Sequence, residues 1–514
     1  MRIPDLLRRS AELHGSLEAI ADARRSLTFR ELEEDALRLA GGLAARGVSA
    51  GDRVAVLAKN RWETIALQFA TSELGAVLVP LNWRLRAAEL RAIAADAQAV
   101  AIAASEEFAD AIAAHRADLP GVRLWIALDG APGWLPFEEL LRERARRDGE
   151  ESVAAIQMYT SGTTGVPRGA LLTHRNVTAM VASWRLELPL APGDRFLQVT
   201  PLFHVGGMLL ATTSLAAGSR LLLHPEFDPG SAARALANEG VTHALLVPSM
   251  VQWIVSERGP TQQQRPFPAL KTIVYGAAPM PVALLVRVME EWGCDFLQGY
   301  GLTETCGVLT ALRPEDHRFD PRATPPRRLA SAGREVSCCE VRVVDGDGRD
   351  VGPDEVGEIV ARGDNVTPGY WRMPEATAEA FRDGWLRTGD LATVDDDGFV
   401  YVVDRLKDMI LVGGENVYPR EIEDVLLRHG SVADAAVIGA PHPVWGEEVV
   451  AIVAARPGAA LSDREVIRHC RERLARFKCP TRVEVRDAIP RSAAGKIEKR
   501  ALREPYWAGR DRRV

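Results

Sequence analysis

The feature that most constrains this chain is a segment of glycine and hydroxyl residues at positions 159–169, Tyr-Thr-Ser-Gly-Thr-Thr-Gly-Val-Pro-Arg-Gly. The preceding residues 153–158 are mostly apolar and predict a buried strand, so the segment begins where a strand ends. Its glycines let the backbone approach a ligand closely, and its hydroxyls and arginine can contact phosphoryl oxygens. We therefore predict a polyphosphate-binding loop formed by Thr160, Ser161, Gly162, Thr163, Thr164, Gly165 and Arg168. The alternative is an ordinary polar surface loop, because these residue types are common in loops.

The segment is not the Gly-x-x-x-x-Gly-Lys-Ser/Thr loop of nucleotide hydrolases. Its basic residue, Arg168, stands three positions after Gly165 and is followed by Gly169. The common nucleotide-hydrolase interpretation is therefore excluded.

Further motifs follow downstream. They are Tyr-Gly-Ala-Ala-Pro at 275–279, Gly-Tyr-Gly-Leu-Thr-Glu-Thr at 299–305, Trp-Leu-Arg-Thr-Gly-Asp at 385–390, Asp-Arg-Leu-Lys-Asp-Met-Ile at 404–410, Gly-Gly-Glu-Asn at 413–416 and Pro-Arg-Ser-Ala-Ala-Gly-Lys at 490–496. With residues 159–169, they make almost the whole chain resemble the adenylate-forming superfamily of acyl-CoA synthetases, adenylation domains and luciferases. The chain looks most like the fatty-acyl and aryl-acid CoA ligase branches. Arg168 stands where that family usually has lysine; because the charge is kept, we expect altered geometry rather than lost function.

Alternating helices and short strands predict an α/β fold. A helix at 29–46, a strand at 53–57, a helix at 62–74 and a strand at 76–80 follow one another, and short apolar strands return at 195–200, 219–223, 243–247 and 272–275. This alternation indicates mostly parallel sheets covered by helices. Strand-like segments at 341–344, 357–361 and 399–403 lie between Gly/Asp turns and predict a small antiparallel sheet or barrel. Residues 313–328, rich in proline and arginine, are expected to form an exposed connector.

We expect two domains, because 514 residues exceed one ordinary hydrophobic core. The best boundary divides an N-terminal AMP-binding domain, residues 1–404, from a small α+β domain, residues 405–514. In the smaller domain we expect helices at 419–427 and 463–474 and strands at 435–438, 449–455 and 482–485. The resemblance implies that this domain is a mobile lid and that the active site lies between the two domains.

Composition and charge narrow the class of protein. Hydrophobic residues make up 47% of the chain and charged residues 26%, as in globular proteins, and the net charge of −7 argues against nucleic acid as the main partner. The first ten residues lack the apolar core of a signal peptide, and the apolar region 205–223, interrupted by glycines and Arg220, predicts a core helix and strand rather than a membrane span. We therefore expect a cytoplasmic protein. The six cysteines form no Cys-x-x-Cys pair and are expected to be idle thiols.

Activation of a carboxylic acid brings two anions together, because the carboxylate attacks the α-phosphorus of ATP, so positive charge must converge there. The resemblance places Lys496 at this point; taken alone, its local sequence indicates a solvated surface lysine. The resemblance also implies that Glu304 holds a Mg²⁺ ion between the phosphates, that Thr303 donates to the α-phosphate and that Tyr300 lies against the adenine. Locally, Thr303 is equally suited to cap a helix, and both roles are compatible.

The resemblance implies further contacts with the substrates. Asp390 and Arg405 would bind the ribose, although Asp390 could instead be a turn residue. Lys407 matches the family's hinge position, and His204 stands where the family gates the acyl and CoA tunnels, with a structural histidine as the alternative. Small residues would line the nucleotide, acyl and CoA sites, namely Gly276, Ala277, Ala278, Gly299, Gly301 and Gly414.

The segments that this family uses to line the acyl pocket are uncharged here, at residues 205–210, 248–251, 276–280 and 306–309. An uncharged pocket suits a fatty or aromatic monocarboxylic acid. We therefore expect a ligase that uses ATP and Mg²⁺ to form an acyl-AMP with release of pyrophosphate, and then transfers the acyl group to CoA. The alternatives are an adenylating enzyme that acylates a carrier protein and a nucleotide-binding scaffold without activity. Dimers are common in the family, so the resemblance allows a homodimer, but the sequence does not fix the oligomeric state.

Overall fold

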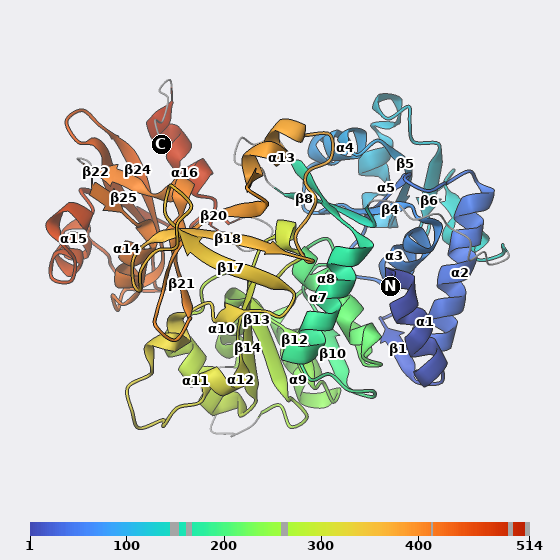
Figure 1. Ribbon diagram of the computed structural model, residues 1–514, viewed down its shortest axis with the longest axis horizontal. Helices are drawn as coiled ribbons and strands as arrows, with labels where there is room; N and C mark the ends of the chain where they lie inside the picture. Colours follow the sequence, from blue (N-terminus) through green and yellow to red (C-terminus); the bar gives the residue numbers. More distant parts are fainter. Residues whose placement is uncertain (144–153, 161–166, 259–265, 413–414, 492–496, 509–514) are drawn as a thin grey trace. The chain divides into compact units, whose positions relative to one another are not determined.

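The computed structural model describes residues 1–143, 154–160, 167–258, 266–412, 415–491 and 497–508. The chain divides into two compact units (Figure 1). The first unit comprises Met1–Val341 and Ala361–Leu386, and the second comprises Arg342–Val360 and Arg387–Val514. The proposed domain boundary between residues 404 and 405 stays a prediction.

The first sheet of the first unit is mostly parallel. Its strands are Glu18–Ala21 (β1), Ser26–Thr28 (β2), Arg195–Gln198 (β10), Arg220–Leu223 (β11), His243–Leu245 (β12), Thr272–Gly276 (β13), Asp295–Tyr300 (β14), Thr310–Leu312 (β15) and Arg334–Glu335 (β16). They are ordered β16-β15-β14-β13-β12-β10-β11-β1-β2, with antiparallel pairing only where β2, β15 and β16 join. Because β13 and β14 run in the same direction, their carboxyl ends meet at one edge of the sheet, where Gly276 and Gly299 are register partners.

The second sheet carries the two strands that flank the predicted phosphate loop. Its strands are Arg53–Leu57 (β3), Val77–Pro80 (β4), Ala99–Ala104 (β5), Leu124–Ala127 (β6), Leu135–Pro136 (β7), Ile156–Thr160 (β8) and Arg168–Leu172 (β9). Their order is β7-β6-β5-β3-β4-β8-β9, parallel except for the β8–β9 pair. The strand predicted at 153–158 is therefore real but runs on to Thr160, which is the register partner of Arg168.

Helices form a layer between these two sheets and cover their outer faces. The inner layer consists of Ile3–His14 (α1), Phe29–Ala45 (α2), Trp62–Leu74 (α3), His174–Glu187 (α7) and Val205–Ala216 (α8), whose apolar residues share one core with both sheets. The outer helices are Pro229–Asn238 (α9), Pro248–Arg258 (α10) and Val282–Trp292 (α11) on the first sheet, and Ala87–Asp96 (α4) and Glu106–Ala113 (α5) on the second. This arrangement confirms the predicted α/β class.

A local sequence signal explains where α2 begins. The α2 helix begins with a capping box, in which the Glu31 amide donates to the Thr28 hydroxyl and the Thr28 amide donates to the Glu31 carboxylate. The remaining short helices of the first unit are Phe137–Leu140 (α6), Pro314–His317 (α12), Pro374–Ala380 (α13) and the 3₁₀ turns Arg116–Asp118 (η1), Thr303–Thr305 (η2) and Arg327–Ala330 (η3).

A third sheet contains the predicted antiparallel segments. Its strands are Cys339–Val344 (β17), Gly357–Gly363 (β18), Phe381–Arg382 (β19), Trp385–Val394 (β20) and Val400–Arg405 (β21). The order is β17-β18-β20-β19, and β21 pairs with β20. The β19–β20 and β20–β21 pairs are antiparallel, as the Gly/Asp turns predicted.

The C-terminal part of the second unit is a sheet between two helical layers. Its strands are Ile410–Val412 (β22), Glu415–Val417 (β23), Val432–His442 (β24), Gly446–Ala455 (β25) and Arg482–Arg486 (β26), and its helical segments are Leu406–Asp408 (η4), Pro419–Leu427 (α14), Asp463–Arg471 (α15), Arg476–Lys478 (η5) and Lys499–Trp507 (α16). Residues in β24 alternate between two cores, with Ala435 and Val437 against α14 and α15, and Ala436 and Ile438 against α16. These elements confirm the predicted α+β organisation.

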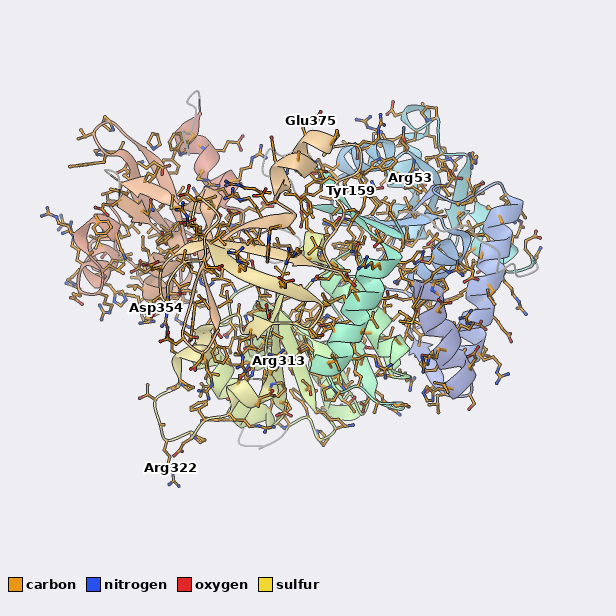
Figure 2. The ribbon with its side chains drawn as sticks, in the orientation of Figure 1. Arg53, Tyr159, Arg313, Arg322, Asp354 and Glu375 are labelled. Carbon is orange, nitrogen blue, oxygen red and sulfur yellow. The ribbon has the colours of Figure 1, made fainter. Side chains whose placement is uncertain are left out.

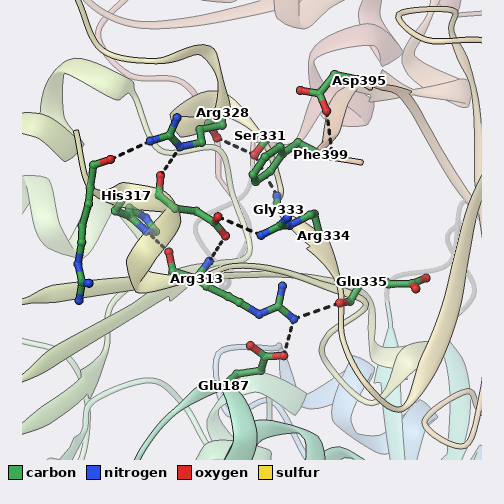
Figure 3. Close-up of polar contacts among 12 residues, drawn as sticks. Glu187, Arg313, His317, Arg328, Ser331, Gly333, Arg334, Glu335, Asp395 and Phe399 are labelled. Carbon is green, nitrogen blue, oxygen red and sulfur yellow. Dashed lines mark hydrogen bonds and ion pairs between the residues drawn. The ribbon is translucent and has the colours of Figure 1, made fainter. Parts of the chain in front are cut away.

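Residues 313–328 are not the fully exposed connector that their composition predicts. They contain α12. Its His317 is 2% exposed and forms a 2.9 Å hydrogen bond with the Tyr275 hydroxyl. Arg313 pairs with Glu187 at 2.7 Å and Arg334 with Asp316 at 3.1 Å (Figure 3). These contacts fasten the segment to β13, α7 and β16, and only its tip around Arg322 points away from the fold (Figure 2).

A buried histidine gives the first unit a pH-dependent stability. His243 is 1% exposed, and burial lowers its pKa from 6.5 to about 4. The unfolded chain therefore takes up a proton at a higher pH than the folded chain, so this contribution to stability is complete above pH 6.5 and is lost as the pH falls toward 4. We expect Tm to fall between about pH 7.5 and about pH 5. In differential scanning calorimetry, His243→Gln should show a smaller fall, and an equal fall would contradict this account.

Among the helices of the described ranges, none combines the length and the apolar character needed to cross a lipid bilayer. The apolar region at 205–223 instead forms α8 and β11, as predicted. All six cysteines are free thiols.

Candidate active site

The predicted phosphate loop has a stem formed by the paired strands β8 and β9, and the structure describes both of them. Thr160 and Arg168 are half-buried partners at the ends of β8 and β9. A Cβ atom on Gly169 would lie 2.7 Å from the Gln157 side-chain nitrogen, so a larger residue there would require the Gln157 side chain to shift. Ser161, Gly162, Thr163, Thr164 and Gly165 lie outside the described residues, and their phosphate contacts stay predictions.

Close packing also explains why the positions predicted to line the nucleotide site are glycines. A Cβ atom on Gly276 would lie 2.2 Å from the carbonyl oxygen of Gly299, and one on Gly301 would lie 2.7 Å from the carbonyl oxygen of Gly307. Ala277 is exposed with φ at +63°, and Ala278 is half-buried. The structure thus brings these residues together at the carboxyl end of β13 and β14, the edge where α/β sheets bind ligands.

Glu304 lies just beyond that edge, in η2. Tyr300 ends β14 and is half-buried, as are Thr303 and Glu304. The alternative that Thr303 caps this turn is wrong, because Leu302 is the N-cap residue and its amide donates to the Thr305 hydroxyl at 2.9 Å. This leaves the Thr303 hydroxyl outside the cap, and its contact with an α-phosphate stays a prediction.

The Glu304 carboxylate suits a magnesium ion. Its Oε1 accepts a 2.8 Å hydrogen bond from the Tyr370 hydroxyl, and no other described residue is bonded to its carboxylate. Among the described residues, no group of three or more His, Cys, Asp or Glu side chains is arranged to hold a metal. Mg²⁺ commonly uses one or two protein carboxylates beside water and substrate phosphates, so a single half-buried glutamate fits this metal and does not form a complete protein cage.

His204 lies at the N-terminus of α8, next to the segments expected to line the acyl pocket. Its ring packs against Phe203 with centroids 4.4 Å apart. Its neighbour Val205 lies beside Gly307, at 3.8 Å from a Cβ atom built there. The start of α8 therefore meets residues 306–309 directly after Glu304, and the buried side chains at this junction, Met208, Cys306 and Val308, carry no charge.

In the second unit, Asp390 and Arg405 are brought together as predicted. They are register partners in β20 and β21, and Arg405 Nε lies 3.1 Å from the Oδ1 atom of Asp390, which is 4% exposed. The alternative of a turn residue is wrong for Asp390, because it lies inside β20, although Gly389 has φ at +72°.

The hinge candidate Lys407 lies in η4, where burial and Arg405 lower its pKa. Its carbonyl accepts a 3.2 Å hydrogen bond from Arg503 of α16. Gly414 and Lys496 lie outside the described residues, so their roles stay predictions.

Sequence reasoning missed one part of the site, residues 363–371. Asn365 donates to the carbonyls of Thr305 and Val308, at 3.1 and 2.9 Å, and Tyr370 holds Glu304. The only available signal was a polar, glycine-containing stretch that reads as a loop. Its contacts are with residues far away in the sequence and therefore leave no local pattern.

Comparisons with known proteins find relatives over most of the chain. The family profile described as "AMP-binding enzyme" matches residues 7–371, and that of the "AMP-binding enzyme C-terminal domain" matches residues 421–496. Feruloyl-CoA synthase from Amycolatopsis sp is 40% identical over 503 residues, covering 97% of this chain and 98% of the relative. The fatty acid–[acyl-carrier-protein] ligase ScoC from Streptomyces coeruleorubidus is 37% identical, covering 95% and 93%.

A solved structure has the same fold. The o-succinylbenzoate CoA synthetase MenE of Bacillus subtilis, in complex with the acyl-adenylate intermediate OSB-AMP, matches with a TM-score of 0.84 and 32% identity, covering 99% of each chain. This likeness confirms the predicted fold of a large α/β N-terminal part and a small α+β C-terminal part. With the profiles matching most of its length, the chain belongs to the family of AMP-binding enzymes.

Proposed function

We propose that this protein is an ATP- and Mg²⁺-dependent ligase that activates an apolar monocarboxylic acid, fatty or aromatic, and joins it to CoA. It is an AMP-forming acid–CoA ligase by its family and its relatives; the apolar acid is the finer part of the proposal. The observation that supports it most is that Tyr370 links Arg168 to Glu304, and that the uncharged residues 306–309 begin two positions after Glu304.

In the first step a carboxylate oxygen of the acid attacks the α-phosphorus of ATP, and the bond to the pyrophosphate leaving group breaks. The phosphate-loop stem and Arg168 would hold the phosphates, and Glu304 would hold Mg²⁺, which when bound neutralises phosphate charge. Lys496 would supply the positive charge that the two approaching anions need. The products are acyl-AMP and pyrophosphate.

In the second step the CoA thiol loses its proton to water and its sulfur attacks the acyl carbon, and AMP leaves with the bonding electron pair. Lys407 and Gly414 are the residues proposed for this step, through a hinge movement that removes Lys496 and opens the thiol's path. Such an exchange needs a backbone position that can change conformation, and Lys407 lies in the short η4 turn between two strands.

The Asp390–Arg405 pair is proposed to bind the ribose. Asp390→Asn keeps the side-chain shape but removes the charged carboxylate that would accept hydrogen bonds from both ribose hydroxyls. We expect KM for ATP to rise about tenfold, because hydrogen bonds to charged groups are the stronger ones. KM for the acid should stay unchanged. The matched control is Asp396→Asn, a change of an exposed aspartate in the turn before β21; equal KM values for ATP in the two variants would contradict the assignment.

A carrier protein is the second candidate for the acyl acceptor, because ScoC, a relative that matches nearly the whole chain, is named as an acyl-carrier-protein ligase. The two candidates differ in one measurable step. Purified acyl-AMP offered to the protein with CoA, or with a phosphopantetheinylated carrier protein, should give thioester only with the true acceptor. Magnesium-dependent release of pyrophosphate with any acid would exclude an inactive scaffold.

A further inference from the structure

One short segment, residues 367–371, connects the phosphate-loop stem with the proposed metal ligand. On one side it lies along β9. The Leu171 amide donates to the Gly369 carbonyl at 3.1 Å, the Trp371 amide donates to the Gly169 carbonyl at 2.8 Å, and Ala170 and Tyr370 form an antiparallel bridge. The segment is therefore fastened to the strand that follows the loop.

On its other side the same segment holds η2. The Thr367 amide donates to the Glu304 carbonyl at 2.7 Å, and the Tyr370 hydroxyl donates to Glu304 Oε1 at 2.8 Å. Both the backbone and the carboxylate of Glu304 are thus set by residues of one segment. A carboxylate that accepts from a protonated donor loses rotamer freedom, which prepares it for a ligand.

Arg168 completes this contact. Its guanidinium carbon lies 5.4 Å from the centre of the Tyr370 ring. A planar guanidinium can lie against an aromatic ring and still offer donors at its edge, whereas a lysine ammonium is a compact point charge. This gives a physical reason for arginine at a position where the family usually has lysine.

The strand that enters the loop is tied to the same segment. The Tyr159 hydroxyl donates to Asp96 Oδ2 at 2.5 Å, and Trp371 Nε1 donates to the Asp96 carbonyl at 3.0 Å. The Arg53 guanidinium lies 4.4 Å from the centre of the Trp371 ring, and Arg53 and Tyr159 lie on the same side of the first unit (Figure 2). Both ends of the loop and Glu304 therefore have one common support.

We propose that Tyr370 is a positioning residue that holds the Glu304 carboxylate in place for the metal–nucleotide complex, and that Arg168 orients Tyr370. This inference rests on the proposed function. Because Oε1 is the acceptor from Tyr370, the second carboxylate oxygen stays available for a metal. The segment thereby connects β9, the strand that follows the loop, to the proposed metal ligand.

The test measures metal binding directly, without turnover. Mn²⁺ is titrated into the protein saturated with the α,β-methylene analogue of ATP, in the absence of acid and CoA, and bound metal is followed by electron paramagnetic resonance. Tyr370→Phe should raise the apparent Kd for the metal about tenfold, because it removes a hydrogen bond to a charged group. Arg168→Lys keeps the charge and should raise it about threefold. Binding of the analogue in EDTA should change less than about twofold in either variant.

A matched control is Tyr401→Phe, which removes a 2.7 Å hydrogen bond from a tyrosine hydroxyl to the carboxylate of Asp395 in the second unit. It should leave the metal Kd at the wild-type value. An unchanged Kd in Tyr370→Phe, or a lower one, which would mean that Tyr370 competes with the metal, overturns the inference while leaving the proposed function intact. If the wild-type protein binds neither analogue nor metal, both fail together.

Discussion

The Lys496→Ala protein is expected to form acyl-AMP about 10²–10³-fold more slowly than the wild type, because it loses a positive charge at the point where two anions meet. The same protein should convert supplied acyl-AMP and CoA into thioester at close to the wild-type rate, since pyrophosphate has left by then. The two half-reactions therefore separate the proposed role from general damage. Rapid-quench measurement of each half-reaction gives both rates.

Lys478→Ala is the control for this experiment. Lys478 belongs to the same unit and pairs with Glu421 at 2.7 Å, with part of its side chain exposed. Its replacement should leave both half-reactions within about twofold of the wild type, as expected for a surface ion pair. A Lys496→Ala protein that forms acyl-AMP as fast as this control would contradict the catalytic assignment.

Gly333→Ala is expected to destabilise the first unit by more than about 4 kcal/mol, in the range reserved for severe backbone conflicts. Gly333 has φ at +81°, and a Cβ atom there would lie 2.0 Å from the Ala311 carbonyl oxygen and 2.2 Å from the Leu312 nitrogen. These are backbone atoms of β15, which pairs with both β14 and β16. They cannot move aside without breaking the sheet next to the Tyr300 end of β14.

Gly384→Ala separates the two causes of this effect. Gly384 has φ at +80° but has no atom within 4 Å of its Cβ position. The free energy of unfolding of this variant should therefore fall only by the conformational cost of a left-handed alanine, about 1–2 kcal/mol. Urea unfolding of both proteins tests the difference. Equal losses would show that the close backbone contact at Gly333 is relieved cheaply.

Sequence patterns predicted the regular elements well wherever local signals agree with burial. The strand Arg53–Leu57 and the helices Trp62–Leu74 and Pro419–Leu427 have the predicted ends. The last of these begins with proline, which suits the first turn of a helix. Strand ends were less accurate, because β8 continues into the polar stem, where pairing with Arg168 extends the strand beyond its apolar residues.

Composition was misleading where long-range contacts determine whether a residue is buried or belongs to a strand. Residues 313–328 are rich in proline and arginine, yet His317 and Asp316 are buried, with partners that come from β13 and β16. Likewise, the Thr-Gly-Asp motif around Asp390 has the composition of a turn, but pairing with β21 keeps it inside a strand. In both cases the partner residues are far away in the sequence, so no local pattern indicates the contact.

The sequence was sufficient to propose site residues, but not to predict the contacts that hold them in place. Glu304, Asp390 and Arg405 were found through motifs, and the structure places Asp390 against Arg405. Tyr370, Asn365 and Thr367 were not, because a residue that positions another is recognised only through its contacts. The contacts of residues 161–165, Gly414 and Lys496 stay predictions.

The central claim is that this chain makes a CoA thioester of an apolar acid through an acyl-AMP. The most direct measurement offers straight-chain fatty acids and substituted benzoic and cinnamic acids with ATP and Mg²⁺, with and without CoA, and identifies the products by mass. The account predicts acyl-AMP without CoA and acyl-CoA with it, for acids of one of these classes. Acyl-AMP that accumulates regardless of CoA, or no nucleotide product from any acid, would contradict it.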